Sequence, residues 1–285
     1  MSFNPSPSKP RLKLPPGACD THFHVFGPQQ RFPFAPDRSY TPAGDAPKET
    51  LFALHKHLGI SRGVVVQSAA HGFDNAAAAG LIAARRNDYA GVALVPASLS
   101  SRELKRLDEQ GFRGARFHFT RHLGTTAPIE EVMRLAARLA DIGWHLQIHY
   151  IGDLLGELAP SLQRSPVPVV IDHMGRADAE QGLDQAPFRG LLKLLEDKKI
   201  WVKVSGAERV SRDGTPYADA VPYGRKLVET FSDRVLWGTD WPHPNLKAVP
   251  DDGILVDLIA QMASSDAQKQ ALLVDNPRRF YGFKS

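Results

Sequence analysis

The sequence predicts an α/β fold in which eight βα units close into a (β/α)8 barrel that forms a single domain. Short apolar runs alternate with amphipathic stretches at intervals of about 25 to 45 residues, which is the spacing of βα units. Runs such as Val64-Val65-Val66 are apolar throughout, as is typical of parallel strands buried on both faces. No glycine-rich nucleotide loop follows any of these runs, which favours a barrel over an open, doubly wound sheet.

Eight apolar runs are the candidate strands, at residues 19–26, 63–67, 91–95, 114–119, 144–150, 167–173, 201–205 and 235–239. Amphipathic stretches predict helices at residues 48–58, 75–86, 101–110, 129–142, 153–158, 188–196 and 218–231, with another pair after Asp252. Residues 1–17 hold five prolines and show no periodicity, so we expect them to form an extended arm. Residues 18–285 are then the barrel.

The composition excludes several classes of function. Lys and Arg outnumber Asp and Glu by 35 to 31, and a net charge of +4 over 285 residues is too weak to predict nucleic-acid binding. No apolar run of membrane length or signal-like segment is present, and the single Cys19 excludes an internal disulfide, so we expect a cytoplasmic protein. The oligomeric state stays open, and a homo-oligomer is possible.

A pair of histidines in the first candidate strand is the first sign of a reaction centre. His22 and His24 project to the same face of a strand, while Phe23 and Val25 pack on the other. Imidazole is both a common metal ligand and a general acid or base near neutral pH, although two ordinary surface histidines would show the same spacing. The following segment, residues 27–46, is long and rich in proline and aromatic residues, so we expect it either to wall the site or to pack only for stability.

Polar residues collect at the carboxyl ends of the later strands, where barrel enzymes carry their chemistry. They are Arg116, His118, Arg121 and His122 after the fourth strand, His149 in the fifth, Asp172, His173 and Arg176 in or after the sixth, and Asp240 and Asn245 after the eighth. This set suits attack of an activated water on a carboxyl-level carbonyl. Asp240 would accept a proton from the water, while His22, His24 and His173 polarise the carbonyl directly or through a divalent ion. Side chains alternate between the two faces of a strand, so Asp172 is expected to point away from the face of His173 and to have a structural role. By the same alternation, Asp20 is expected to lie on the face of His22, deeper in the barrel.

Several arginines predict an anionic substrate. Guanidinium groups bind carboxylates or sulfonates, and Arg116, Arg121, Arg176 and Arg209 follow strands four, six and seven. Ion pairing of these arginines with Glu208 and Asp178 is the alternative. Tyr40 and Asn245 are further candidates for hydrogen bonds to the substrate, whereas Trp241 is expected to serve packing.

The motifs resemble the amidohydrolase superfamily, in the branch that contains the pyrone dicarboxylate lactonases. They are His22-Phe-His24, Asp172-His173-Met-Gly-Arg176 and Trp237-Gly-Thr-Asp240-Trp-Pro-His-Pro, and the similarity runs nearly end to end through Phe32-Pro-Phe, His71-Gly-Phe-Asp74-Asn75 and Asn276-Pro. The resemblance implies hydrolysis of a small anionic lactone in bacterial aromatic catabolism. It also implies Asp240 as base, His22, His24 and His173 around the carbonyl, and Tyr40, Arg116, Arg176 and Arg209 on substrate carboxylates.

One departure from that branch bears on a metal. The pyrone lactonases are thought to work without metal and carry a tyrosine at the end of the fifth strand, where this chain has His149. His22, His24, His149, His173 and Asp240 together would make a chemically complete site for a divalent metal, with zinc the expected ion, as in the related sulfomuconolactone hydrolases. A metal-dependent nonoxidative decarboxylase and a noncatalytic carboxylate-binding barrel are the alternative functions.

Overall fold

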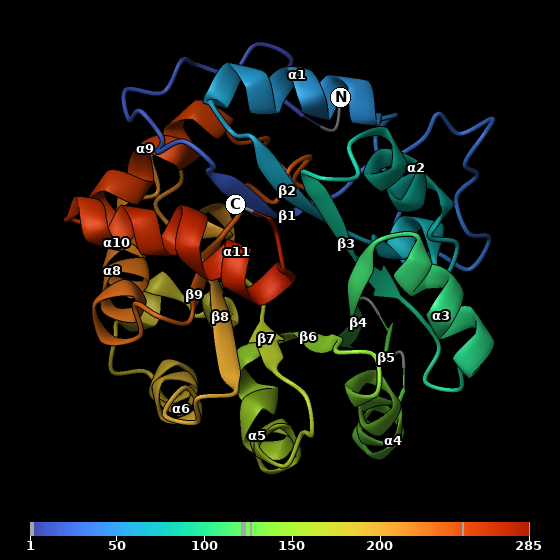
Figure 1. Ribbon diagram of the computed structural model, residues 1–285. Coiled ribbons are helices and arrows are strands. Elements are labelled where there is room, and N and C mark those ends of the chain that lie inside the picture. Colours follow the sequence, from blue (N-terminus) through green and yellow to red (C-terminus); the bar gives the residue numbers. More distant parts are fainter. Residues whose placement is uncertain (1–2, 121–123, 126, 247, 285) are drawn as a thin grey trace.

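The computed structural model describes residues 3–120, 124–125, 127–246 and 248–284, and these form the expected barrel (Figure 1). Eight parallel strands pair in chain order around the barrel, interrupted only by a short β5 that pairs antiparallel with β4. The strands are β1 (Cys19–Phe23), β2 (Arg62–Val66), β3 (Tyr89–Leu94), β4 (Phe112–Thr120), β5 (Gly124–Thr125), β6 (His145–Tyr150), β7 (Val169–Ile171), β8 (Ile200–Val204) and β9 (Val235–Trp237).

Hydrogen bonds close the barrel between β1 and the segment at and just after β9. The Thr21 hydroxyl donates to the Trp237 carbonyl at 2.8 Å, and the amides of Asp240 and His24 donate to the His22 and Trp241 carbonyls at 2.7 Å each. These bonds hold the end of β9 against the histidine pair of β1. The prediction of a single-domain α/β barrel is therefore confirmed.

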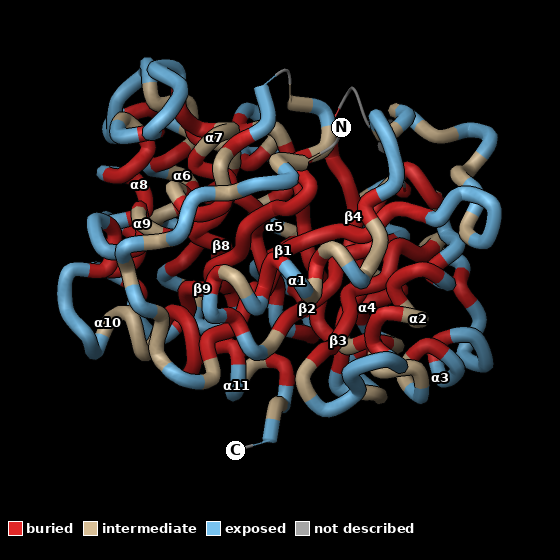
Figure 2. The backbone as a smooth tube through the Cα atoms, turned by 90° about the horizontal axis from the view of Figure 1, so that it is seen from above, coloured by how far each residue is buried: buried red, intermediate tan, exposed pale blue. Residues whose placement is uncertain are grey.

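The helices surround the strands, and exposed segments form the rim of the molecule (Figure 2). The helices are α1 (Lys48–Leu58), α2 (Ala76–Ala84), α3 (Ser101–Glu109), α4 (Ile129–Ala140), α5 (Leu155–Gln163), α6 (Ala186–Leu194), α7 (Ala207–Val210), α8 (Val221–Thr230), α9 (Asp252–Met262), α10 (Asp266–Gln270) and α11 (Asn276–Tyr281). Local sequence accounts for several ends: Gly59 adopts φ 84° after α1, and Ser100 with Glu103 forms a capping box at α3. The fifth predicted helix begins two residues late and extends to Gln163, and the short α7 was not predicted.

Two apolar clusters fill the fold. One lies between the strands and the surrounding helices, while a smaller one occupies the barrel interior through inward residues such as Val64, Val92, Val170 and Trp201. Tyr281 of α11 belongs to this inner cluster and covers it at the end where the strands begin. The opposite half of the interior holds charged and polar side chains, so the fold itself places the chemistry at the carboxyl ends of the strands.

Residues 3–17 contain no helix or strand and run past α1 and α9 (Figure 1). The Ser8 amide and hydroxyl both donate to Asp251, which precedes α9, and the Arg11 and Leu12 amides donate to Asp257 within that helix. A Cβ atom on Gly253 would lie 2.1 Å from the Ser8 carbonyl oxygen, so glycine is needed for this close approach. None of the helices in the described part of the chain combines the length and apolar character needed to cross a bilayer.

Candidate active site

The histidine pair of β1 faces the barrel interior as predicted. Phe23 points outward and packs edge-on against His55 of α1, with ring centroids 5.1 Å apart, while His22 and His24 both approach Asp240. The expectation for Asp20 is wrong. A register shift in β1 between Asp20 and Phe23 breaks the alternation, so Asp20 bonds to Thr239 and lies 3.3 Å from His55 instead of sharing the face of His22.

Three imidazoles converge on one oxygen of Asp240. The Nε2 atoms of His24, His22 and His173 lie 3.4, 3.6 and 3.7 Å from Asp240 Oδ1. Asp240 itself has a positive φ of 64° after the end of β9, which turns its side chain into this cluster. Its other oxygen, Oδ2, accepts a hydrogen bond from Arg209 Nε. Burial alone would raise the pKa of Asp240, but Arg209 and then His173 hold that pKa well below its ordinary value.

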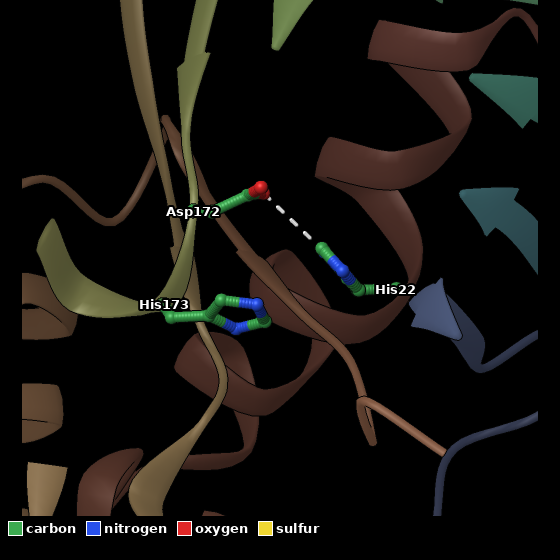
Figure 3. Close-up of side chains that lie close together, drawn as sticks. All are labelled: His22, Asp172 and His173. Atoms are coloured by element: carbon green, nitrogen blue, oxygen red, sulfur yellow. Dashed lines mark ion pairs between the residues drawn. The ribbon is translucent and has the colours of Figure 1, made fainter. Parts of the chain in front are cut away.

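Asp172 and His173 both point into the barrel, so the expected orientation of Asp172 is wrong (Figure 3). Asp172 follows the regular alternation from the inward Val170. His173 is the residue that departs from it, because β7 ends at Ile171 and the φ of His173 is 50°. Asp172 Oδ1 lies 3.3 Å from His22 Nδ1, and the ring centroids of His22 and His173 are 4.4 Å apart.

Asp172 is the centre of a buried ion cluster below the histidines. Arg116 Nε and Nη2 lie 3.0 and 2.9 Å from Asp172 Oδ2, and Gln147 Nε2 donates to Oδ1 at 2.8 Å. Burial opposes ionisation, but Arg116 and His22 hold the pKa of Asp172 well below its usual range. Arg116, which the sequence suggested as a substrate ligand, is thus already paired through these two atoms with a carboxylate of the chain.

Lys203 is the site residue that sequence reasoning missed. Its buried ammonium donates to the Thr21 carbonyl at 2.7 Å and to Gln147 Oε1 at 2.9 Å, and it lies 3.2 Å from His22 Nδ1. Burial lowers the pKa of Lys203 to about 7. The signal was available in the sequence, because β8 reads Ile-Trp-Val-Lys-Val and the alternation places Lys203 inside with Trp201.

The polar half of the barrel opens into a cavity of about 300 Å³. Its lining includes the predicted site residues His24, Tyr40, Arg116, His149, His173, Arg176, Arg209, Asp240 and Asn245. Tyr40 reaches it from the long segment after β1, and its hydroxyl lies 2.5 Å from Ser68 Oγ. Arg121 lies outside the described residues, so its substrate role stays a prediction.

Arg176 differs from the other described arginines of this cavity. Arg116 pairs with Asp172, Arg209 with Asp240 and Arg212 with Asp178, whereas within the described parts of the chain no carboxylate oxygen lies within 4.0 Å of Arg176. Burial, with Arg209 nearby, lowers the pKa of Arg176 to about 10, so it is still a cation at neutral pH. A half-buried guanidinium without a counterion among the described residues is a site for an anionic group of a ligand.

His149 lies on the far side of His173 from His22. The ring centroids of His149 and His173 are 5.6 Å apart, and His149 Nδ1 lies 3.4 Å from His118 Nδ1. Burial and then Arg116 lower the pKa of His149 well below its ordinary value, so it is neutral at pH 7. Among the described residues, the sets of potential ligand atoms within 4.8 Å of one another do not include His149, and its metal role stays a prediction.

Three of the other predicted ligands, His22, His24 and Asp240, form a set that fits one divalent ion, whereas His173 belongs to a separate set with His22 and Asp172. His24 Nδ1 lies 2.7 Å from the Val66 carbonyl, which can only accept, so the lone pair of His24 is on Nε2 and faces the carboxylate. His22 Nε2 is buried without a hydrogen-bond partner in the part of the chain that the structure describes. Separations of 3.4 and 3.6 Å join His24 Nε2 and His22 Nε2 to Asp240 Oδ1, and they are close to those around a tetrahedral ion with bonds of about 2.0–2.2 Å.

A third group of potential ligand atoms, from Glu208, Asp240 and His243, shares Asp240 with the set of His22, His24 and Asp240. Arg209 Nε lies against both carboxylates of this group. A guanidinium therefore already supplies positive charge there.

Comparison with known families identifies the fold. A family model described as Amidohydrolase matches residues 19–283. The chain belongs to the amidohydrolase family. The resemblance to the amidohydrolases that the motifs indicated is thus confirmed. The prediction of a hydrolase that acts on lactones is confirmed by the relatives described next.

Two relatives cover almost the whole of this amidohydrolase. It is 48% identical to the 2-pyrone-4,6-dicarboxylate hydrolase of Comamonas testosteroni over 99% of this chain and 95% of that protein. It is 37% identical to the 4-sulfomuconolactone hydrolase of Hydrogenophaga intermedia over 95% of this chain and 91% of that protein. A crystal structure from Acinetobacter baumannii, described as a probable 2-pyrone-4,6-dicarboxylic acid hydrolase with citric acid bound, is 26% identical with a TM-score of 0.84, covering 94% of this chain and 100% of that chain.

Proposed function

We propose that this amidohydrolase opens a small anionic lactone by hydrolysis, in the catabolism of aromatic compounds. The observation that carries the proposal is the placement of an ionised Asp240 among three imidazoles, in the cavity that also exposes the unpaired Arg176. The full-length similarity to two lactone hydrolases supports it, because both relatives are named for substrates that carry anionic groups.

Asp240 acts as the general base in the proposed reaction. Arg209 keeps its carboxylate ionised at neutral pH, so it is ready to take a proton from a water held between it and the lactone carbonyl. The water oxygen adds to the carbonyl carbon, and the bond from that carbon to the ring oxygen breaks. The proton taken up by Asp240 passes to the ring oxygen, so the products are a carboxyl group and a hydroxyl group on the opened chain. Each step leaves charge that the surrounding cations and imidazoles can stabilise.

In the proposed reaction the imidazoles lie beside the carbonyl oxygen, which gains negative charge as the water adds. His173 is fixed by Ser205, whose Oγ lies 3.0 Å from its Nδ1, and His24 is fixed by the Val66 carbonyl, so both rings present Nε2 to the reacting centre. A divalent ion held by His22, His24 and Asp240 would supply Lewis-acid polarisation of that carbonyl and lower the pKa of a bound water. Lys203 and Asp172 hold His22 from the opposite side.

Arg176 fixes the substrate by binding a carboxylate or sulfonate on the ring. It is the cavity arginine that brings a half-buried positive charge without a partner carboxylate among the described residues. Tyr40 and Asn245 line the same cavity and offer hydrogen bonds to the rest of the anion. A neutral lactone would leave this guanidinium unpaired and should bind more weakly.

The test is a panel of lactones that includes pyrone dicarboxylate, muconolactones and one neutral lactone, assayed with wild type and two variants. Asp240→Asn should lower kcat by about 10²–10⁴-fold, as expected for loss of a general base. Arg176→Met should raise KM for anionic lactones and leave the neutral one unchanged. Glu157→Gln, an exposed position on α5, is the matched control. Release of CO₂ without ring opening would instead identify a decarboxylase, and ligand binding without turnover would identify a noncatalytic binder.

A further inference from the structure

A row of buried charges of alternating sign leads away from Asp240 toward the start of α9. Arg209 Nε binds Asp240 Oδ2 and lies 3.7 Å from Glu208 Oε1. His243 Nδ1 lies 3.8 Å from the same Glu208 oxygen, and His243 Nε2 lies 3.0 Å from Asp252 Oδ1. The order of the charged groups is therefore carboxylate, guanidinium, carboxylate, imidazole, carboxylate. Three elements contribute to it: the loop after β9, α7 and the first residue of α9.

Each link of this row is shielded from solvent. The side chains of Glu208 and His243 are 1% and 0% exposed, and that of Asp252 is also 0% exposed. The carboxylates of Asp252 and Glu208 raise the pKa of His243 to about 10 in spite of its burial, so the imidazole is a cation at neutral pH. Charges at these distances interact much more strongly inside a protein than they would in water.

Glu208 is the unusual member. Neither of its carboxylate oxygens has a hydrogen-bond partner among the described residues, although both are buried. Burying a carboxylate without hydrogen bonds is unfavourable unless nearby cations compensate. The two cations beside Glu208 are Arg209 and His243. Because burial of the Glu208 carboxylate without hydrogen bonds is unfavourable, its place between Arg209 and His243 suggests that it holds these two cations in position.

Arg209 needs such a hold because it works beside another guanidinium. Arg176 and Arg209 line the same cavity. They are close enough that the positive charge of Arg209 helps to lower the pKa of Arg176. Arg209 Nη2 also donates to the Pro244 carbonyl at 3.0 Å, which fixes one side of the group. Glu208 approaches Arg209 Nε, the atom that also binds Asp240, and so opposes displacement of Arg209 when an anionic substrate enters and offers it a second carboxylate.

We propose that Glu208, His243 and Asp252 are positioning residues that keep Arg209 bound to Asp240 while an anionic substrate occupies the cavity. Glu208 also lines the cavity, whereas His243 and Asp252 are not among its lining residues, and all three act through Arg209. They act by stabilising the position in which the Arg209 guanidinium binds Asp240, relative to a position in which it binds a carboxylate of the substrate. The catalytic part of this inference rests on the proposed lactone hydrolysis, whereas the placement of Arg209 does not.

The direct test is the geometry of Arg209 in wild type and in Glu208→Gln, both crystallised with a tricarboxylate such as citrate. In wild type the Nε hydrogen bond to Asp240 should persist. In Glu208→Gln the guanidinium should move from Asp240 to the bound carboxylate, and an unchanged hydrogen bond would overturn the proposal. Because this measurement needs no turnover, it decides the inference even if the lactone panel shows no hydrolysis.

Kinetics on an accepted lactone test the same idea independently. Glu208→Gln and Asp252→Asn should each lower kcat at least tenfold with less than a threefold change in KM, and the Glu157→Gln control should match wild type. In an Arg209→Lys background, Glu208→Gln should cause less than a further twofold loss, because the residue it positions is already altered. Multiplying losses would mean that Glu208 acts independently of Arg209 and would contradict the proposal. Asp252→Asn, at the far end of the row, keeps the test decisive if Glu208→Gln does not fold.

Discussion

Lys203 gives the sharpest quantitative prediction, because its ammonium is buried inside the barrel. Burial lowers its pKa from 10.5 to about 7. Between these two pH values the unfolded chain carries a proton on Lys203 that the folded chain lacks. Unfolding therefore consumes a proton in that range, and the free energy of unfolding rises with pH. The whole shift corresponds to about 5 kcal/mol, of which roughly 3–4 kcal/mol falls between pH 7 and pH 10.

The perturbation is Lys203→Met, which keeps the length of the side chain and removes the charge. Guanidinium denaturation of chelator-treated protein at pH 7, 8, 9 and 10 gives the free energy of unfolding of each form. Relative to wild type, the variant should lose about 3–4 kcal/mol of stability across that range, because only wild type gains from losing a proton. Lys198→Met, which removes an exposed ammonium just before β8, controls for the loss of a lysine as such.

Comparing the two curves removes the other groups that titrate over the same range. His243 is one of them, because its raised pKa favours the folded state below the unfolded value of about 6.5 and loses this effect as pH rises toward 10. It contributes to both forms and cancels in the difference. Parallel curves for wild type and Lys203→Met, within about 1 kcal/mol, would refute the view that the barrel interior suppresses the charge of Lys203.

Three further outcomes follow from the same contacts. Asp172→Asn should lower the free energy of unfolding by about 3–5 kcal/mol, since it leaves the buried Arg116 without its partner carboxylate, and the double variant with Arg116→Met should recover part of that loss in denaturation experiments. No recovery would mean that the pair is not coupled. Asp251→Ala should lower the free energy of unfolding by about 1–2 kcal/mol, because Asp251 caps α9 and also binds Ser8. Ser8→Ala removes only the second of these contacts and should lower that free energy by less. Equal losses for the two variants would contradict a capping role for Asp251. Elemental analysis should find one divalent ion for each chain, and His24→Ala should abolish it; ion-free wild type that keeps its activity after exhaustive chelation would assign polarisation of the carbonyl to the imidazoles alone.

The elements of the fold were predictable because their patterns are local. The helix expected at residues 48–58 has these bounds in the structure, and the eight candidate strands all occur. Strand ends were less predictable. The strand expected at residues 167–173 ends at Ile171, and that shortening is what turns His173 into the barrel. Hydrophobic patterns define the buried middle of a strand but not the point where its hydrogen bonds to neighbours stop.

The site was predictable as a set of residues, but not as a network of partners. The sequence identified His22, His24 and Asp240, because polar side chains at strand ends meet in a barrel. The sequence could not indicate that Arg116 pairs with Asp172, because the two residues are 56 positions apart. Either of them could equally have bound the substrate or had a structural role. Alternation failed for Asp20 because a single bulge changes the face of every residue beyond it.

The electrostatics of Asp240 bear on how the catalytic work is divided. A carboxylate whose pKa lies well below its ordinary value is fully ionised at neutral pH, but it is also a weak base. Arg209 therefore secures the protonation state of Asp240 at the expense of its proton affinity. In the proposed reaction the missing driving force must come from stabilising the oxygen that gains negative charge. His22 and His173 would do this with a proton on Nε2, whereas His24, whose Nε2 carries a lone pair, would act only through a bound ion.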